Sequence, residues 1–316
     1  MEFEDLKARI QRLRPVASWP QMLEFVDRAV SREGSIWEYP AAACQAVGGS
    51  EGPAVAAAAA IFCSVASIRL VDDMLDEDPR GDYRVVGTGQ AANLALAFQA
   101  AGHLLLDDPE IPAAIRPALH ACFADMSLAT CRGQDLDARE LRCEEEYWRV
   151  VESKTPPLFA AALRMGALLG GAPADTADGL ARLGGVLGRF IQVSDDVTDA
   201  LGTPARADWK RRGNNLALLY ALTAPHADRE EFLRLSLAVD DPGALAAAQK
   251  ILLRSGAVSF CTLKLLEFSR EARQLTARLQ LREPAPIARL VELHEQPLHR
   301  LLESVGVGEP AELSFF

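Results

Sequence analysis

Hydrophobic positions recur along this chain at intervals of three and four residues, which is the period of an amphipathic α-helix. No segment shows the sustained alternation of apolar and polar residues that is typical of a half-buried strand. Proline and glycine gather between the periodic segments, where they end helices. The pattern therefore predicts an all-α protein. The expected helices cover 3–13, 20–31, a segment starting near 37, 54 to the acidic residues before Pro79, 89–106, 118–137, 144–169 with a break at Lys154-Thr-Pro-Pro157, 178–201, 216–223 and four more segments up to about Val305.

Length and composition place few further limits on the architecture. The 316 residues contain no linker long enough to separate two domains, so we expect one domain over 1–316. The longest apolar run, from Ala54 to Ile68, is shorter than the ~20 residues that a membrane span needs. We interpret this run as a buried core helix and expect no membrane span. The N-terminus has no apolar core of the signal-peptide type, which favours a cytoplasmic protein.

The charge of the chain argues against one large class of partners. Its formal net charge is −11 and its isoelectric point is near 5.1. Nucleic-acid binding normally requires a basic surface, so we expect no nucleic-acid partner. An anionic small molecule would have to be held by local cations or by metal ions.

Two clusters of aspartates share the same spacing far apart in the chain. Asp72, Asp73 and Asp76 end one strongly apolar helix, and Asp195, Asp196 and Asp199 lie near the end of another. Residues four apart share one face of a helix, so each cluster directs two carboxylates the same way. Clustered carboxylates repel one another unless a cation neutralises them. The pair of clusters therefore predicts a metal site; the alternative is two solvated acidic helix ends.

The donor atoms indicate which metal and which substrate to expect. Carboxylate oxygens without a nearby His or Cys favour Mg²⁺ or Mn²⁺, and Mg²⁺ commonly completes its coordination with water and substrate phosphates. A phosphate ester is the implied substrate.

With these motifs the chain resembles the trans-prenyl diphosphate synthases and their class I terpene synthase relatives. The resemblance runs from about Trp37 to Leu222 and also includes Gly133-Gln134-Asp135, Lys154-Thr155, Gln192 and the segment 216–222. It implies a single isoprenoid-synthase helical bundle with a central cavity, and a homodimer. It also implies three Mg²⁺ ions that draw the diphosphate off an allylic prenyl substrate.

The resemblance assigns roles to particular residues. It implies metal ligation by Asp72, Asp76, Asp195 and Asp199, with Asp73, Asp196 and Gln192 completing the catalytic group. The diphosphate would be bound by Arg80, Lys154, Lys210 and Arg212. The prenyl tail would lie against Ser64, Ile68 and Gln134; because the face one and two turns before Asp72 is small or aliphatic, we expect a substrate of farnesyl length or longer.

The chain departs from the family pattern at the positions that hold a second substrate, isopentenyl diphosphate. Ile36 and Tyr39 replace a lysine and an arginine, Val65 replaces a histidine, and Arg80 stands where the family has two arginines. Apolar side chains cannot compensate the desolvation of a diphosphate. We therefore expect a terpene synthase-like enzyme that cyclises the cation or quenches it with water.

Two alternatives remain open. The first is a chain-elongating polyprenyl diphosphate synthase, or a prenyltransferase that uses another acceptor. The second is an inactive regulatory subunit, which would have no reason to keep both aspartate clusters, Lys154 and Gln192.

Overall fold

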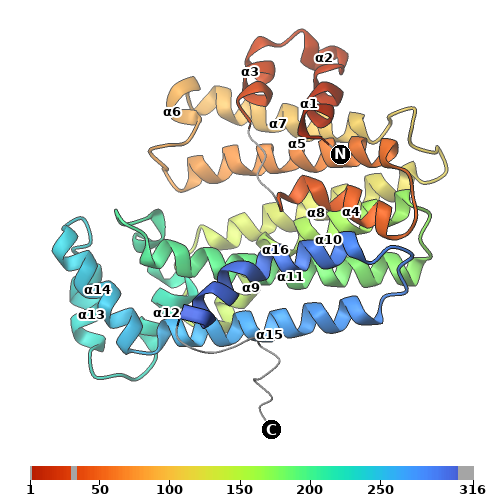
Figure 1. The fold of residues 1–316 in the computed structure, drawn as a ribbon. Coiled ribbons are helices and arrows are strands. Elements are labelled where there is room, and N and C mark those ends of the chain that lie inside the picture. Colours follow the sequence, from red (N-terminus) through yellow and green to blue (C-terminus); the bar gives the residue numbers. More distant parts are fainter. Residues whose placement is uncertain (1, 30–33, 305–316) are drawn as a thin grey trace.

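The structure is a computed structural model that describes residues 2–29 and 34–304. Every regular element within these residues is helical, which confirms the all-α prediction (Figure 1). The helix ends predicted at Ser31 and Val305 lie outside the described residues. The α-helices are α1 (Phe3–Gln11), α2 (Arg14–Ala17), α3 (Pro20–Arg28), α4 (Tyr39–Ala46), α5 (Glu51–Leu75), α6 (Tyr83–Val86), α7 (Thr88–Leu105), α8 (Arg116–Asp137), α9 (Glu144–Lys154), α10 (Pro156–Leu169), α11 (Ala174–Leu201), α12 (Leu216–Thr223), α13 (Arg229–Ser236), α14 (Pro242–Arg254), α15 (Ala257–Arg278) and α16 (Ala285–Ser304).

The helices pack in layers. In Figure 1, α5 and α7 lie side by side beneath α1–α3, and the layer of α4, α8, α10 and α11 follows. The long helix α15 packs against α11 on the opposite side, and α12–α14 project at one end of the bundle. Short 3₁₀ turns complete the chain at η1 (Ile36–Glu38), η2 (Ala207–Trp209) and η3 (Arg212–Asn214).

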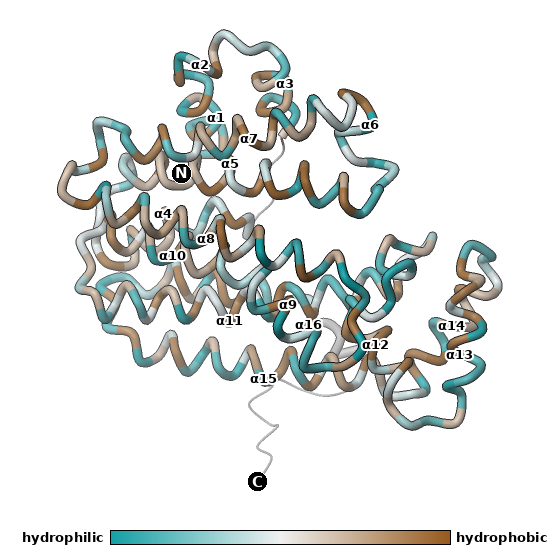
Figure 2. The backbone as a smooth tube through the Cα atoms, turned by 180° about the vertical axis from the view of Figure 1, so that it is seen from behind, coloured by the Kyte–Doolittle hydropathy of each residue, from teal (hydrophilic) through white to brown (hydrophobic). Residues whose placement is uncertain are grey.

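Helix α11 connects two groups of buried apolar side chains. Its Leu183 and Leu187 belong to the core shared with α4, α5, α7 and α10. One and two turns later, Phe190 and Val193 belong to a second core shared with α12–α15. Outer helix α15 alternates between hydrophobic and hydrophilic positions, as expected for a helix with one buried face (Figure 2). The second aspartate cluster therefore lies on a helix fixed by packing on several sides.

Helix α5 carries the first aspartate cluster at its end and is strongly apolar over most of its length. It is long and apolar enough to cross a membrane by length and composition, but 78% of that apolar window is buried inside the bundle. Its run of alanines from Ala56 to Ala60 is completely buried, and such small side chains allow neighbouring helices to approach closely. The helix ends at Leu75, with Asp76 as its C-cap.

The predicted helix boundaries differ from the observed ones at the start of α5, near Pro53, and between α14 and α15, at Gly256. Helix α5 begins at Glu51, so that Pro53 lies in its first turn, where a missing N–H needs no partner. The four helical segments expected after residue 223 are α13–α16. The sharp boundary between α14 and α15 was not among the expected turns; there Gly256 adopts a left-handed φ of 87°.

Two adjacent glycines in α11 provide a test of this packing. A Cβ atom added at Gly184 would lie 2.3 Å from the carbonyl oxygen of Phe159 in α10, whereas one at Gly185 would meet nothing within 4 Å. We expect Gly184→Ala to lower the free energy of unfolding by ~1–3 kcal/mol through overpacking. Gly185→Ala should leave stability unchanged or raise it by up to ~1 kcal/mol, because alanine favours the helix. Urea denaturation checks both; equal effects of the two substitutions would contradict the close α10–α11 contact.

Candidate active site

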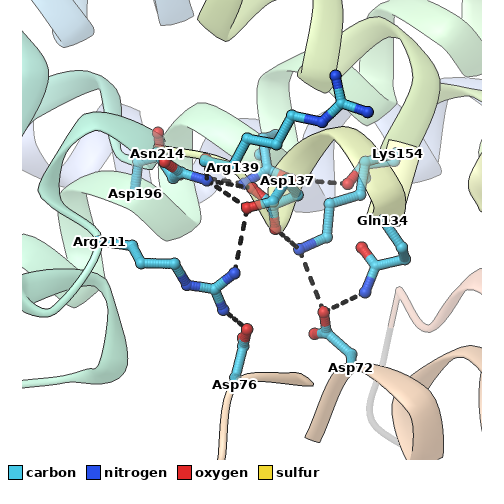
Figure 3. Close-up of polar contacts among 11 residues, drawn as sticks. Asp72, Asp76, Gln134, Asp137, Arg139, Lys154, Asp196, Arg211 and Asn214 are labelled. Carbon is cyan, nitrogen blue, oxygen red and sulfur yellow. Dashed lines mark hydrogen bonds and ion pairs between the residues drawn. The ribbon is translucent and has the colours of Figure 1, made fainter. Parts of the chain in front are cut away.

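The end of α5 directs Asp72 and Asp76 toward residues from α8, α9 and the segment after α11 (Figure 3). Oδ1 of Asp72 lies 3.3 Å from Nζ of Lys154 and accepts a hydrogen bond from the side-chain amide of Gln134. Asp76 forms an ion pair with Arg211. The two carboxylates that share a helix face thus each meet a cation from a distant part of the chain.

Lys154 reaches the site because α9 ends there. The chain breaks between α9 and α10 at Thr155, directly before Pro156, as the proline pair predicts. Gly133 in α8 permits this end of α9 to approach, since a Cβ atom on it would lie 2.6 Å from the backbone of Ser153 and Lys154. Burial would lower the pKa of the Lys154 ammonium, but the charges of Asp72 and Asp137 raise it above its ordinary value. Lys154 is therefore a fixed positive charge.

Asp137 is a part of the site that the sequence reasoning missed. Its Oδ2 accepts a hydrogen bond of 2.6 Å from Lys154, and its Oδ1 accepts one of 2.9 Å from Asn214. The guanidinium of Arg211 also donates to the Asp137 backbone carbonyl at 3.1 Å. Asp137 follows Gln134 by three residues on α8, so a helical wheel centred on Gln134 would have found it.

In the second cluster, Asp196 is 2% exposed and its carboxylate is held by protein groups. Its Oδ2 accepts hydrogen bonds of 2.7 Å from the Tyr147 hydroxyl and from the Leu216 backbone N–H. Its Oδ1 accepts one of 3.0 Å from Gln192. Burial raises the pKa of Asp196 to about 7, although these hydrogen bonds oppose the rise. Asp196 thus connects α11 with α9 and α12.

Gln192 extends this connection to the break between α9 and α10. The Thr155 hydroxyl donates a hydrogen bond of 2.6 Å to its side-chain carbonyl. The Asn215 side chain, which caps α12, donates to the Asp196 backbone carbonyl and to Asp208, each at 2.7 Å. These contacts explain why an amide and a carboxylate four residues apart on α11 both face inward.

Asp195 and Asp199 are less compensated than Asp196. The enclosing protein, together with the like charges of Asp199 and Asp208, raises the pKa of Asp195 to about 6. Burial also raises the pKa of Asp199, against a lowering by Arg206, whose Nε lies 4.0 Å from its Oδ1. Burial likewise raises the pKa of Asp208. This side of the site has an excess of negative charge that a cation would relieve.

The two clusters meet at a small cavity. It measures about 60 Å³ and is lined by Asp76 from the first cluster and by Gln192 and Asp196 from the second. The other charged residues of its wall are Asp137, Lys154, Asp208 and Arg211. Segments more than a hundred residues apart in the sequence are thereby brought together around one polar space.

The remaining basic residues lie at the mouth of the site. Arg80, Lys210 and Arg212 line a cavity of about 370 Å³ next to Asp76. Arg80 forms an ion pair of 2.8 Å with Asp78. Arg212 donates a hydrogen bond of 3.0 Å to the Ser236 backbone carbonyl. Of the basic run 210–212, Arg211 is the residue that contacts the aspartate cluster.

The donor set fits divalent cations bound together with a substrate. Among residues 2–29 and 34–304, no three His, Cys, Asp or Glu side chains are arranged to hold a metal ion by themselves. Pairs of carboxylates are present on both helices, and Mg²⁺ is commonly bound through one or two carboxylates plus substrate phosphates. Asp195 and Asp199, which are less compensated than Asp196, are available for such binding.

The positions expected to face the prenyl tail lie further back on α5 and on α8. Ser64 is completely buried, and its hydroxyl has no hydrogen-bond partner in the described part of the chain. Gln134 is buried, and Ile68 is half-buried. Their role as a prenyl pocket stays a prediction.

Ile36, Tyr39 and Val65, which stand where the family pattern has basic residues, differ in their burial. Ile36 and Tyr39 belong to the apolar core shared by α4, α5, α7, α10 and the first half of α11. Tyr39 packs against Phe159, with ring centroids 5.1 Å apart, and its hydroxyl is hydrogen-bonded to Nε2 of His294. Val65 is only partly buried. Burial lowers the pKa of His294 to about 4, so Tyr39 is part of a neutral buried pair.

Comparison with known proteins relates this arrangement to one group of enzymes. The family model described as polyprenyl synthetase matches residues 41–251. A short chain isoprenyl diphosphate synthase from Methanothermobacter thermautotrophicus is 31% identical over 249 residues, which cover 73% of this chain and 75% of the relative.

Solved structures show the same fold at lower identity. A decaprenyl diphosphate synthase from Rhodobacter capsulatus superposes with a TM-score of 0.78 at 20% identity, covering 93% of both chains. A polyprenyl synthase from Caulobacter crescentus, solved with calcium and isoprenyl diphosphate, has a TM-score of 0.78 at 18% identity and covers 93% of this chain and 92% of its own.

The Tyr39–His294 pair, in which Tyr39 is completely buried and His294 is partly buried, predicts a pH dependence of stability. The His294 pKa is about 4 in the folded protein and ordinarily about 6.5 in an unfolded chain. The unfolded state therefore binds the proton first, and the free energy of unfolding should fall as the pH drops from about 6.5 to about 4, by up to ~3 kcal/mol. His294→Gln should lose this component, whereas His120→Gln, a control at a half-buried histidine, should keep it. Urea denaturation at pH 7 and pH 4.5 measures it; an unchanged pH difference in His294→Gln would contradict burial of a neutral imidazole.

Proposed function

Since this chain belongs to the polyprenyl synthetase family, we propose that it elongates an allylic prenyl diphosphate by joining it to isopentenyl diphosphate. Members of the family are prenyltransferases that use divalent metal ions with diphosphate substrates. The observation that carries the proposal is one polar cavity lined by an aspartate from each cluster, Asp76 and Asp196, and by Lys154, which also forms an ion pair with Asp72. Such a site suits a diphosphate leaving group.

The comparisons favour elongation over the cyclase that the missing cations suggested. The sequence expectation rested on Ile36, Tyr39 and Val65, and it correctly identified an enzyme of isoprenoid metabolism. Relatives that cover two thirds or more of this chain, however, are named as prenyl diphosphate synthases, including a nonaprenyl diphosphate synthase from Mycobacterium tuberculosis that is 29% identical. Elongation is therefore the activity that we assign first.

The reaction joins two substrates and releases one diphosphate. The bond between C1 of the allylic substrate and its diphosphate oxygen breaks, and C1 bonds to the terminal alkene carbon of isopentenyl diphosphate. Loss of one proton from the acceptor restores a double bond, giving a longer allylic diphosphate and inorganic diphosphate. Divalent cations supply charge neutralisation to the leaving diphosphate.

The residues of this chain prepare that step by position and charge. Asp72, Asp76, Asp195 and Asp199 would hold the cations. Lys154 would donate hydrogen bonds to the leaving diphosphate, and it is already fixed by Asp72 and Asp137. Arg80 and Lys210 at the mouth would contact the same diphosphate. Tyr147 and Gln192 would act as positioning residues because they orient Asp196.

Several finer features belong to the same proposal. They are three Mg²⁺ ions, an allylic substrate of farnesyl length or longer, a homodimer and a cytoplasmic location. Each rests on the family resemblance or on sequence composition and stays a prediction.

The proposal is tested by incubating the purified protein with farnesyl diphosphate and Mg²⁺, with and without isopentenyl diphosphate, and separating the products by chromatography. We expect a longer prenyl diphosphate only when isopentenyl diphosphate is present, and no product in excess chelator. Asp72→Asn and Asp195→Asn should each reduce turnover at least 100-fold, since they weaken metal binding at the leaving group. A hydrocarbon or alcohol formed regardless of isopentenyl diphosphate would support a cyclase instead.

A further inference from the structure

A separate pocket of about 270 Å³ opens beside α5, close to the first aspartate cluster. Three aromatic side chains, Phe25, Trp37 and Phe62, contribute to its wall together with Val65. The rings of Trp37 and Phe62 meet edge to face with centroids 5.5 Å apart. This part of the pocket suits a short apolar group.

Two guanidinium groups approach the same pocket from different helices. Arg28 comes from the end of α3, and Arg69 comes from α5. Both side chains are largely solvent-exposed, with 50% and 70% of their surface accessible. They therefore combine with the aromatic wall to make an amphiphilic site for an anion that carries a small apolar group.

The guanidinium groups are held at the rim by contacts with acids. Nε of Arg28 lies 3.9 Å from Oε1 of Glu24, one helical turn earlier on α3. Nη1 of Arg28 lies 3.2 Å from Oδ1 of Asp82, which also lines the pocket. Nε of Arg69 lies 3.9 Å from Oδ2 of Asp73. A guanidinium has five N–H donors, more than these contacts use, so both groups keep capacity for phosphate oxygens.

The pocket is correctly placed for a second substrate. Arg69 precedes Asp73 by one helical turn, which corresponds to ~6 Å along the helix axis. A molecule bound against Val65 and Arg69 would thus lie next to the aspartate cluster that is expected to hold the allylic diphosphate. By contrast, Ile36 and Tyr39 are buried in the core and Tyr39 is paired with His294, so neither offers a charge.

We propose that Arg28 and Arg69 bind the diphosphate of the acceptor substrate in this pocket, with its short isoprenyl group against the aromatic wall. In this chain the acceptor-binding cations come from α3 and α5, in place of those absent at Ile36, Tyr39 and Val65. Asp82 weakens acceptor binding by competing for Arg28. The inference rests on the proposed elongation activity, and its test separates the two.

The first experiment measures steady-state kinetics with farnesyl diphosphate and isopentenyl diphosphate in Mg²⁺. Arg28→Ala and Arg69→Ala should each raise the KM for isopentenyl diphosphate by about 10- to 100-fold, as expected for losing one charge-assisted contact. The KM for farnesyl diphosphate should change by less than about threefold. Arg28→Lys and Arg69→Lys should recover part of the loss.

Two further variants distinguish binding from a structural effect. Asp82→Asn should change the KM for isopentenyl diphosphate in the opposite direction, lowering it, because Arg28 loses its competing partner. Arg84→Ala removes a nearby guanidinium that lies over the Tyr83 ring rather than in the pocket, and it should leave both KM values unchanged. Thermal unfolding confirms that each variant is folded.

Elongation with a wild-type KM for isopentenyl diphosphate in both arginine-to-alanine variants would overturn this inference and leave the proposed function intact. If the wild-type protein does not elongate, calorimetric titration with isopentenyl diphosphate tests directly whether the pocket binds this substrate. Binding that is lost in Arg28→Ala and Arg69→Ala would support the pocket while rejecting the proposed elongation. No binding to the wild-type protein would overturn the pocket as well.

Discussion

The structure depends on holding many carboxylates close together at the meeting point of two long helices. The carboxylates at this point are those of Asp72 on α5, Asp76 at the C-cap of α5, and Asp195, Asp196 and Asp199 on α11, together with Asp137 and Asp208. The like charges of neighbouring carboxylates repel one another, and burial adds a desolvation cost. The fold offsets both effects with hydrogen bonds to Asp196 and with ion pairs from Lys154 and Arg211. The excess charge that remains, at Asp195 and Asp199, is on the side of the site that most needs an added cation.

The same compensation explains the arrangement of the surrounding helices. The break between α9 and α10 brings Lys154 to Asp72 and Thr155 to Gln192. Glycine at position 133 permits the required approach of α8 and α9. The 3₁₀ turn η3 and the cap of α12 present Asn214 and Asn215 to Asp137 and Asp196. Packing in the two apolar cores therefore holds the helices in place, although the carboxylates that they carry repel one another.

Features with a local cause could be predicted from the sequence, and features that depend on long-range packing could not. The helical period, the proline break at 154–157 and the paired aspartates are local patterns, and the structure contains each of them. Asp208 and Tyr147 carry no local pattern that links them to Asp196. Among the adjacent residues Lys210, Arg211 and Arg212, only the course of the chain decides which one reaches Asp76.

The expectation of a cyclase is not supported by the comparisons, and it too neglected long-range packing. It compared charges position by position, at Ile36, Tyr39 and Val65, and could not include the acceptor-binding cations that we propose at Arg28 and Arg69. Arg28 reaches the flank of α5 only through the packing of α3, which no motif specifies. A lost cation at an aligned position therefore does not establish a lost substrate site.

The proposed reaction requires both aspartate clusters to bind divalent cations together with one diphosphate. Its most direct test is a crystal structure of the protein with Mn²⁺ and inorganic diphosphate, in which anomalous scattering locates the ions. We expect ions between the diphosphate and Asp72 and Asp76 on one side and Asp195 and Asp199 on the other, with Lys154 in contact with the diphosphate and Arg211 displaced from Asp76. Diphosphate bound elsewhere, or ions absent from both clusters at saturating Mn²⁺, would contradict this mode of metal and diphosphate binding.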